Sequence, residues 1–191
     1  MLLRAQRQGF LGPGPVGEHL QHASGFAAAV DAPQRALDLG SGGGIPGLAL
    51  ALAWPDSRWV LLDGGDRRAA ALGEAVDELD LGSRVTVVAR RAELAGRDEG
   101  LRGTFDLVVA RSFGRPAVTA ECASGFLAAG GLLVVSEPPE DQPDRWPEDG
   151  LALLGLVDRG RHGAVRVLAQ VEATPDRYPR RVGIPTKRPL W

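Results

Sequence analysis

The stretch Ala36–Gly47, ALDLGSGGGIPG, decides the fold, because an apolar run there ends in an acidic residue and a series of glycines. A residue without Cβ lets the backbone turn tightly and come close to a ligand, as Gly40, Gly42 and Gly44 would allow. The backbone N–H groups of a helix that starts after them would face that ligand. The pattern therefore predicts a strand, a ligand-binding loop and a helix.

A second acidic residue, Asp63, ends the next apolar run, WVLLD, where a parallel strand would place a carboxylate beside a ribose. Two cofactors are compatible with this arrangement. The glycines at positions 42, 44 and 47 satisfy the G-x-G-x-x-G pattern of dinucleotide-binding folds. The D-x-G-x-G-x-G spacing that starts at Asp38 resembles motif I of the class I S-adenosylmethionine methyltransferases. We favour the methyltransferase interpretation.

Length and composition indicate one globular domain. The chain has 191 residues, of which 44% are hydrophobic, enough for one well-buried core. We expect a single methyltransferase domain over 1–191, with a cap segment at 1–34, a core at 35–172 and a basic tail at 173–191. The apolar runs are short, so no membrane span or signal peptide is expected and a cytoplasmic location is the default. Cys122 is the only cysteine, which excludes an internal disulfide and a cysteine-built zinc site.

Charge is distributed unevenly along the chain. The net charge is −2, but all 24 acidic residues lie between Glu18 and Asp176. All the charged side chains at the two ends are therefore basic: Arg4, Arg7, Arg177, Arg180, Arg181, Lys187 and Arg188. Clustered basic side chains suit a polyanionic partner, because they release counterions from phosphates. A solvated tail is the alternative.

Strand and helix patterns alternate along the chain, which predicts a parallel sheet with helices on both faces. Expected strands cover 36–39, 58–63, 84–89, 105–110 and 131–136; expected helices cover about 18–30, a stretch from about 46, 66–80 and 116–128. The apolar runs 151–157 and 164–171 flank a turn-like stretch, 159–163, which predicts a helix or strand entering a hairpin. The expected fold is α/β, Rossmann-like, with a mostly parallel seven-stranded sheet and a C-terminal antiparallel hairpin.

Five motifs narrow the resemblance: LDLGSGGGIPGLALALAWPD, LLDGGDRRAAAL, VVARRAE, FDLVVARSF and RYPRRVGIPTKRPL. Together they resemble the small-subunit ribosomal RNA guanine-N7 methyltransferase family, also called glucose-inhibited division protein B, from about Gly12 onward. The resemblance implies transfer of a methyl group from S-adenosylmethionine to N7 of a guanine in 16S rRNA. The implied partner is ribosomal RNA or the small ribosomal subunit.

The same resemblance implies the residues of a cofactor site. Asp38 would orient the loop, Asp63 would accept hydrogen bonds from both ribose hydroxyls, and Arg111 would be catalytic and bind the cofactor carboxylate or an RNA phosphate. An ordinary helix-start carboxylate is the alternative for Glu93, and a structural ion pair is the alternative for Arg111. The remaining cofactor-binding candidates are Gly40, Ser41, Gly42, Gly44, Ala92 and Glu93.

Acceptor-binding candidates lie at the end of the fourth strand and in the tail. Phe113 would stack on the purine, although a core position is equally compatible with its sequence. Arg180, Arg181 and Lys187 would contact RNA phosphates. Guanine N7 bears a lone pair and needs no general base, so the expected mechanism is direct in-line transfer. No metal is expected, since two histidines three residues apart, His19 and His22, more often form a polar helix face.

Two other functions remain open. The short segment before Glu18 and an acid at Glu137, where the family commonly has Lys-Gly, favour a methyltransferase of a small molecule or peptide. A noncatalytic protein that binds RNA or the ribosome and retains the cofactor fold is the third hypothesis. The oligomeric state is not indicated by the sequence.

Overall fold

Seven strands form a single sheet in the computed structural model, which describes residues 1–140, 142 and 144–191. The strand order is β3-β2-β1-β4-β5-β7-β6. The first five strands pair in parallel, and β7 is antiparallel to both β5 and β6. The predicted mostly parallel sheet with a C-terminal antiparallel hairpin is therefore confirmed. The strands are β1 (Arg35–Leu39), β2 (Arg58–Asp63), β3 (Val85–Ala89), β4 (Phe105–Ala110), β5 (Leu127–Ser136), β6 (Leu156–His162) and β7 (Val165–Gln170).

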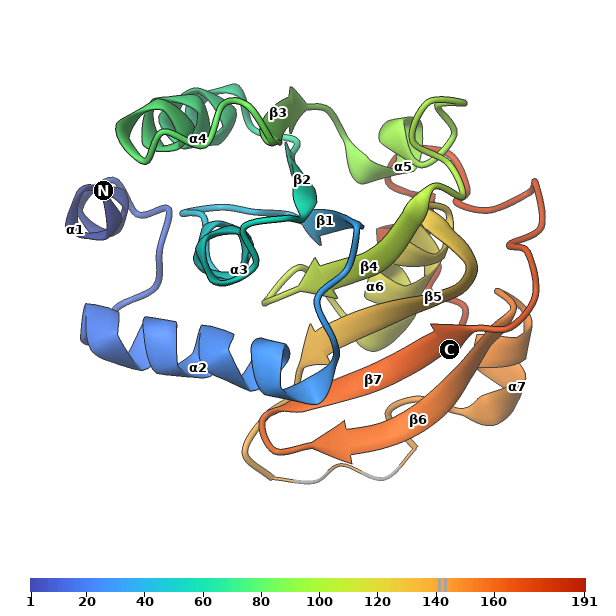
Figure 1. Cartoon of the computed structure of the whole chain (residues 1–191). Helices are drawn as coiled ribbons and strands as arrows, with labels where there is room; N and C mark the ends of the chain where they lie inside the picture. The colour runs from blue at the N-terminus through green and yellow to red at the C-terminus, as the bar shows by residue number, and fades with distance from the viewer. Residues whose placement is uncertain (141, 143) are drawn as a thin grey trace.

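Helices cover both faces of the sheet (Figure 1). On one side lie α1 (Leu2–Arg7), α2 (Val16–Ala29), α3 (Gly47–Ala53) and α4 (Asp66–Glu78). On the other lie α5 (Ala92–Ala95), α6 (Pro116–Ser124) and α7 (Glu148–Ala152), together with the tail that contains α8 (Ile184–Lys187). No helix of the described residues has the length and apolar character needed to span a bilayer.

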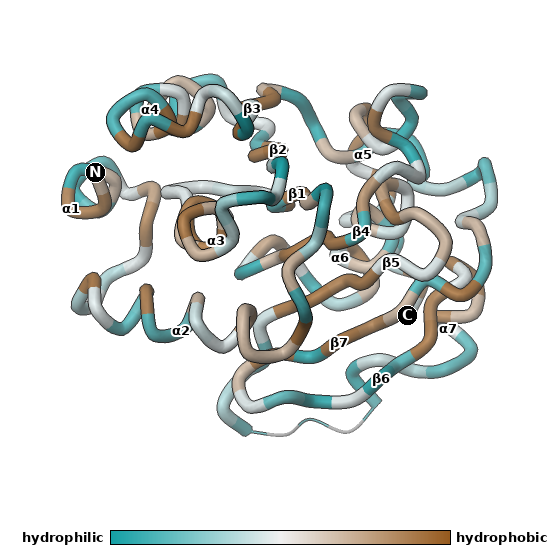
Figure 2. Tube along the Cα trace, viewed as in Figure 1, coloured by the Kyte–Doolittle hydropathy of each residue, from teal (hydrophilic) through white to brown (hydrophobic). Residues whose placement is uncertain are grey.

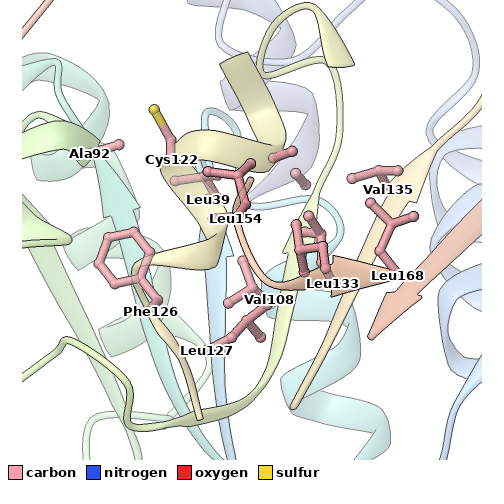
Figure 3. Packing of buried hydrophobic residues seen from close by; sticks show 14 of the residues in the cluster. Leu39, Ala92, Val108, Cys122, Phe126, Leu127, Leu133, Val135, Leu154 and Leu168 are labelled. Carbon is pink, nitrogen blue, oxygen red and sulfur yellow. The ribbon is translucent and has the colours of Figure 1, made fainter. Parts of the chain in front are cut away.

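Alternation along the strands produces two cores. In β1, Leu37 and Leu39 face the cluster that α5, α6 and α7 complete, whereas Ala36 faces the cluster of α2, α3 and α4. Figure 3 shows the first cluster, in which Phe126, Leu133 and other fully buried side chains pack together. Each such leucine or phenylalanine stabilises the fold by about 1.5–3 kcal/mol. Figure 2 shows the same division by hydropathy, with β7 hydrophobic in the interior and β6 more polar at the edge.

One predicted boundary is wrong. The helix expected over 116–128 ends at Ser124, and β5 begins at Leu127 rather than after the Gly130-Gly131 pair. The pairing register between β4 and β5 shifts at this point, so the two glycines form a bulge inside the strand instead of a break before it. Gly130 has φ +80°, and a Cβ on Gly131 would come within 2.8 Å of the Phe105 carbonyl oxygen. Only glycine suits this close approach.

Short helices account for the other differences. A helix or a strand was expected for the apolar run 151–157. Its first residues end α7 and its last residues begin β6, so both a helix and a strand occur there. Pro147 precedes α7, and Glu148 and Asp149 lie in its first turn, where acidic side chains interact favourably with the helix dipole. The sequence patterns did not predict α1, α5 or α8, each of six residues or fewer. Such helices depend on tertiary packing rather than on their own propensity.

Candidate cofactor site

Asp38 holds the loop after β1 in place from inside the protein. It is 1% exposed, and its Oδ2 accepts a hydrogen bond of 3.0 Å from the Gly47 N–H at the start of α3. The Ser41 hydroxyl donates to the Asp38 carbonyl at 2.9 Å. A Cβ on Gly47 would lie 2.5 Å from Oδ2, so this contact needs glycine. Burial raises the pKa of Asp38 to about 7, although the Gly47 hydrogen bond opposes the rise.

Asp63, at the end of β2, joins the same loop to α4. Its Oδ2 accepts the Gly42 N–H at 3.0 Å, and its Oδ1 accepts the Gly65 N–H at 2.8 Å. Arg68 Nε also donates to Oδ1 at 2.9 Å, and Arg68 Nη2 forms an ion pair with the same oxygen at 2.8 Å. The Asp63 side chain is 5% exposed, whereas that of Arg68 is 45% exposed.

The hydrogen-bond acceptor positions of the Asp63 carboxylate are partly occupied, which limits how it could bind a diol. A carboxylate offers about four lone-pair positions. Two on Oδ1 are taken by Gly65 and Arg68, and one on Oδ2 is taken by Gly42. One position therefore remains, while a ribose diol needs two. Arg68 is the partner that can leave, because the other two donors are backbone groups of the loops around it.

A cavity of about 540 Å³ opens beside these two acids. The predicted site residues that line it are Gly40, Gly42, Asp63, Ala92, Glu93 and Phe113. Sequence reasoning did not assign to this site Arg68, Arg91, Ser112, Val118, Cys122 and Thr186, which also line it. Four of them lie inside the quoted motifs, so membership of a motif was a usable signal for Arg68, Arg91, Ser112 and Thr186. Nothing in the sequence pattern connects Val118 or Cys122 with the loop.

Several predicted residues lie behind the cavity rather than on its wall. Asp38 and Ser41 are buried beneath the loop. Gly44 lies against the helix side, where a Cβ would come within 2.5 Å of Leu48 Cδ1. Phe113, by contrast, covers the loop directly, since a Cβ on Gly40 would lie 2.6 Å from its ring. The structure thus brings the aromatic ring and the glycine loop together.

Arg111 follows β4 and points its guanidinium toward α2. Nη2 lies 2.7 Å from His19 Nδ1, and His19 Nε2 lies 3.1 Å from the Gly12 carbonyl oxygen. The carbonyl can only accept, so His19 carries its proton on Nε2 and accepts from Arg111 through Nδ1. Burial lowers the pKa of Arg111, and the nearby Asp38 opposes this. Nη1 is buried and has no acceptor among the described residues.

Cys122 belongs to α6 and borders the cavity, but it is not an activated thiol. It is 1% exposed, and burial followed by the charges of Glu93 and Glu121 raises its pKa. The protonated thiol is a poor nucleophile. Cys122 is therefore a packing residue of the first core cluster.

Arg180 has a different environment from the one expected. Its Nε and Nη2 donate to the two carboxylate oxygens of Glu121 at 2.8 and 2.6 Å, and its backbone N–H donates to Glu121 at 2.8 Å. Glu121 is 0% exposed. The guanidinium is thus paired with a buried carboxylate, and the structure offers no support for the phosphate contact predicted for Arg180. Arg181 and Lys187 are exposed.

These features fit S-adenosylmethionine. The unpartnered Arg111 Nη1 suits an amino-acid carboxylate and the Asp63 carboxylate suits a ribose, while Gly40 lets the Phe113 ring pack against the loop. A sheet of this order with a glycine loop after β1 and an acid after β2 defines a class I methyltransferase. Similar folds occur in an O-methyltransferase family protein from Burkholderia thailandensis (TM-score 0.61, 16% identity, 82% of this chain and 56% of that one) and in PigF with SAH (TM-score 0.60, 18% identity, 82% and 56%).

Sequence comparisons identify the family. Residues 16–141 match the family model described as rRNA small subunit methyltransferase G. The Ribosomal RNA small subunit methyltransferase G of Synechococcus sp. (strain WH7803) is 37% identical over 174 residues, which cover 84% of this chain and 67% of that protein. The protein of the same name from Prochlorococcus marinus (strain MIT 9313) is 38% identical over 169 residues, covering 83% and 68%.

The chain belongs to the rRNA small subunit methyltransferase G family. It is an S-adenosylmethionine-dependent methyltransferase.

Proposed function

We propose that the chain methylates N7 of a guanine in the 16S rRNA of the small ribosomal subunit by direct in-line transfer. The relatives are named for ribosomal RNA of the small subunit, which supports the acceptor class. The observation that carries the proposal is the chemistry of the cavity wall. Among the described residues that line it, Asp63 and Glu93 are engaged in hydrogen bonds and the Cys122 thiol is protonated. Guanine N7 needs neither a general base nor a thiol, so this wall suits it.

Each cofactor-site residue then has a role. Bound S-adenosylmethionine supplies the methyl group from its sulfonium. We assign the cofactor carboxylate to Arg111 and the ribose hydroxyls to Asp63. The loop Gly40–Gly44, which Asp38 and Ser41 support, would surround the methionine part and sugar, and Ala92 and Glu93 would border the adenine.

The acceptor would lie at the mouth of the cavity beside Phe113. N7 would form the new bond with the methyl carbon as the carbon–sulfur bond breaks, which leaves S-adenosylhomocysteine and a positively charged base that has no proton to lose at N7. The protein then has to align the base with the methyl group and exclude water. Bringing the two reactants into this alignment accounts for a large part of the barrier in such reactions. Phe113 would stack on the purine, and Arg181 and Lys187 would contact phosphates.

Nucleoside mass spectrometry of 16S rRNA from a deletion strain tests the proposal. We expect one 7-methylguanosine to be lost, and to return when the wild-type gene is supplied but not when Arg111→Ala is supplied. Cys122→Ser tests the mechanism, because loss of turnover from a folded variant would point to thiol chemistry. An unchanged 7-methylguanosine content in the deletion strain would contradict the acceptor, and purified protein would then be offered small molecules and peptides with labelled cofactor.

A further inference from the structure

The C-terminal tail is fastened to the domain near the cofactor cavity. Arg102 donates to the carbonyl oxygens of Thr174 and Tyr178, both at 2.8 Å, and Arg97 Nε donates to that of Pro179 at 2.8 Å. The Arg180–Glu121 ion pair fixes the next residue to α6. The tail therefore crosses α5 and α6, the two helices that form one wall of the cavity.

Glu93 connects the tail directly with the cavity. Its side chain lines the cavity, is 4% exposed, and accepts the Gly183 N–H at 2.9 Å. Arg91 lies 3.3 Å from the same oxygen. Burial opposes ionisation of Glu93, but the hydrogen bonds, that of Gly183 first among them, outweigh burial and keep its pKa below the usual value. Three residues beyond Gly183, Thr186 itself lines the cavity.

The segment held by Glu93 carries exposed cations. Arg181 and Lys187 lie two residues before and four residues after Gly183, and neither makes an ion pair with the described part of the chain. Their position depends on where Gly183 is held. Gly183 has φ +78°, a conformation that suits glycine, so the chain turns at the residue that Glu93 binds.

We propose that Glu93 is a positioning residue that holds the tail against the cofactor cavity, so that cofactor and RNA bind cooperatively. A cofactor in the cavity would restrain Glu93 and Thr186 and thereby the segment 181–187. Arg181 and Lys187 would then meet phosphates in a fixed arrangement. By linkage, RNA would raise the affinity for the cofactor by the same factor. The RNA part of this inference rests on the proposed function, whereas the restraint of the tail does not.

Hydrogen exchange tests the restraint without RNA. In the wild type, saturating S-adenosylhomocysteine should slow exchange of the amides in 181–187, including Gly183, by about fivefold or more. Glu93→Ala removes the acceptor and should abolish the slowing, while Glu93→Gln keeps an oxygen acceptor and should restore most of it. Glu78→Gln, which removes an exposed ion pair with Arg4 far from the tail, is the matched control. Equal slowing in the wild type and in folded Glu93→Ala would overturn the inference.

RNA binding tests the cooperativity. We expect the affinity of the wild type for 16S rRNA fragments to rise about fivefold or more with S-adenosylhomocysteine, and the ratio to fall to about one in Glu93→Ala with recovery in Glu93→Gln. A wild-type protein that shows the exchange effect but binds no RNA would contradict the proposed acceptor and leave the tail restraint established. RNA binding that does not respond to S-adenosylhomocysteine would overturn the cooperativity alone.

Discussion

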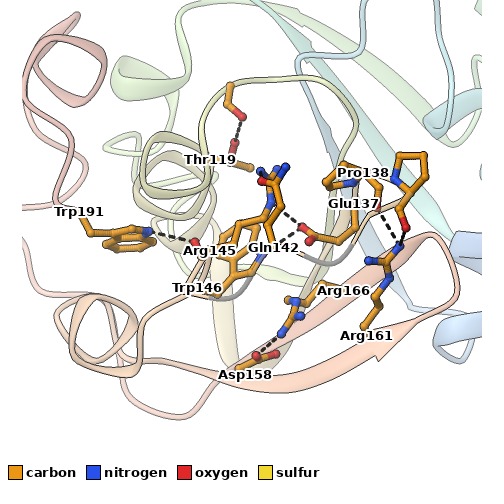
Figure 4. A network of polar contacts seen from close by, with 12 residues as sticks. Thr119, Glu137, Pro138, Gln142, Arg145, Trp146, Asp158, Arg161, Arg166 and Trp191 are labelled. Atoms are coloured by element: carbon orange, nitrogen blue, oxygen red, sulfur yellow. Dashed lines mark hydrogen bonds and ion pairs between the residues drawn. The ribbon is translucent and has the colours of Figure 1, made fainter.

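Two regions at the carboxyl end of the sheet each contain a buried acidic side chain, and the two side chains differ in their hydrogen-bond partners. At the cofactor edge, formed by the ends of β1, β2 and β4, Asp63 is bound by two loop amides and by a half-exposed Arg68, and it retains a free acceptor position. At the closed edge, formed by the end of β5 and by α6, Glu137 accepts from Arg145 at 3.1 Å and from the Trp146 indole at 3.0 Å. Figure 4 shows these contacts around Glu137.

This difference in partners distinguishes an acidic side chain that can bind a ligand from one that only stabilises the fold. Both carboxylates follow parallel strands of one sheet, so the backbone gives them similar positions. The partners of Glu137 come from the core side of the following segment, whereas Arg68 can turn into solvent. Buried polar groups are normally satisfied within the protein. At the cofactor edge Asp63 has a removable partner and Arg111 Nη1 has none among the described residues, so a ligand can complete both groups there.

The largest effect is expected from a substitution that removes an ion pair at the closed edge. Arg180→Ala leaves Glu121, which is 0% exposed, without its counter-charge. Removing one partner of a buried ion pair costs about 3–5 kcal/mol, and we expect that loss in the free energy of unfolding measured with urea. Arg181→Ala, at the exposed neighbouring position, should change it by no more than about 0.5 kcal/mol. Equal small effects of both variants would contradict a structural role for Arg180.

Removing the acid of the cofactor edge should act on binding. Asp63→Ala deletes the carboxylate that we propose binds the ribose hydroxyls, and we expect S-adenosylhomocysteine to bind about 2–3 kcal/mol more weakly in calorimetry. Glu137→Gln is the matched change at the closed edge, and it should lower stability while leaving this affinity close to the wild-type value. Similar affinity losses in both variants would show that the two edges do not differ in the way described.

Sequence patterns predicted the sheet well because its central strands β1, β2 and β4 are largely buried on both faces and stand out as apolar runs. They also located Asp38 and Asp63, because each ends such a run beside glycines. They could not predict the β5 bulge, since two adjacent glycines are compatible with a break as well as with a bulge. Only packing against Phe105 decides between them.

Long-range pairs account for what the sequence missed at the site. The partner of Arg180 is Glu121, 59 residues away, so this tail cation is paired with a buried carboxylate of α6. The place of Thr186 in the cavity likewise depends on the path of the whole tail. Neither spacing nor composition contains that path, because it results from contacts with Arg97, Arg102 and Glu93.

A pH experiment sharpens the comparison within the cofactor edge. The pKa of Asp38 is raised to about 7, above its value in the unfolded chain, so between about pH 4 and 7 the folded state holds the extra proton. Stability from this group is therefore present at low pH and is lost as pH rises through 7. Asp38→Asn stays neutral, so its melting temperature relative to wild type should be higher at pH 8 than at pH 5.

The size of that shift follows from linkage. Each unit of pKa difference corresponds to about 1.4 kcal/mol, and a domain of this length changes its melting temperature by about 2–4 °C per kcal/mol. Scanning fluorimetry resolves such a change. A constant difference between variant and wild type across this range would contradict the raised pKa.

The smallest expected effect concerns the removable partner itself. If Asp63 binds the ribose diol as we propose, Arg68 occupies an acceptor position that the diol needs, and the cofactor must displace it from Asp63. Arg68→Ala removes the competitor from the free enzyme, and the affinity for S-adenosylhomocysteine should rise. Exposed ion pairs contribute about 0.2–1 kcal/mol, which limits the gain to about fivefold.

Arg67→Ala is the matched control for this prediction. Arg67 precedes Arg68 on α4, is also exposed, and lies 5.9 Å from the Phe10 ring rather than on Asp63. Its removal should leave the calorimetric affinity within error of the wild type. A loss of affinity in Arg68→Ala alone would mean that Arg68 contacts the bound cofactor instead of giving way to it. The cofactor edge would then be completed by Arg68 and the ligand together, as the closed edge is completed by Arg145 and Trp146.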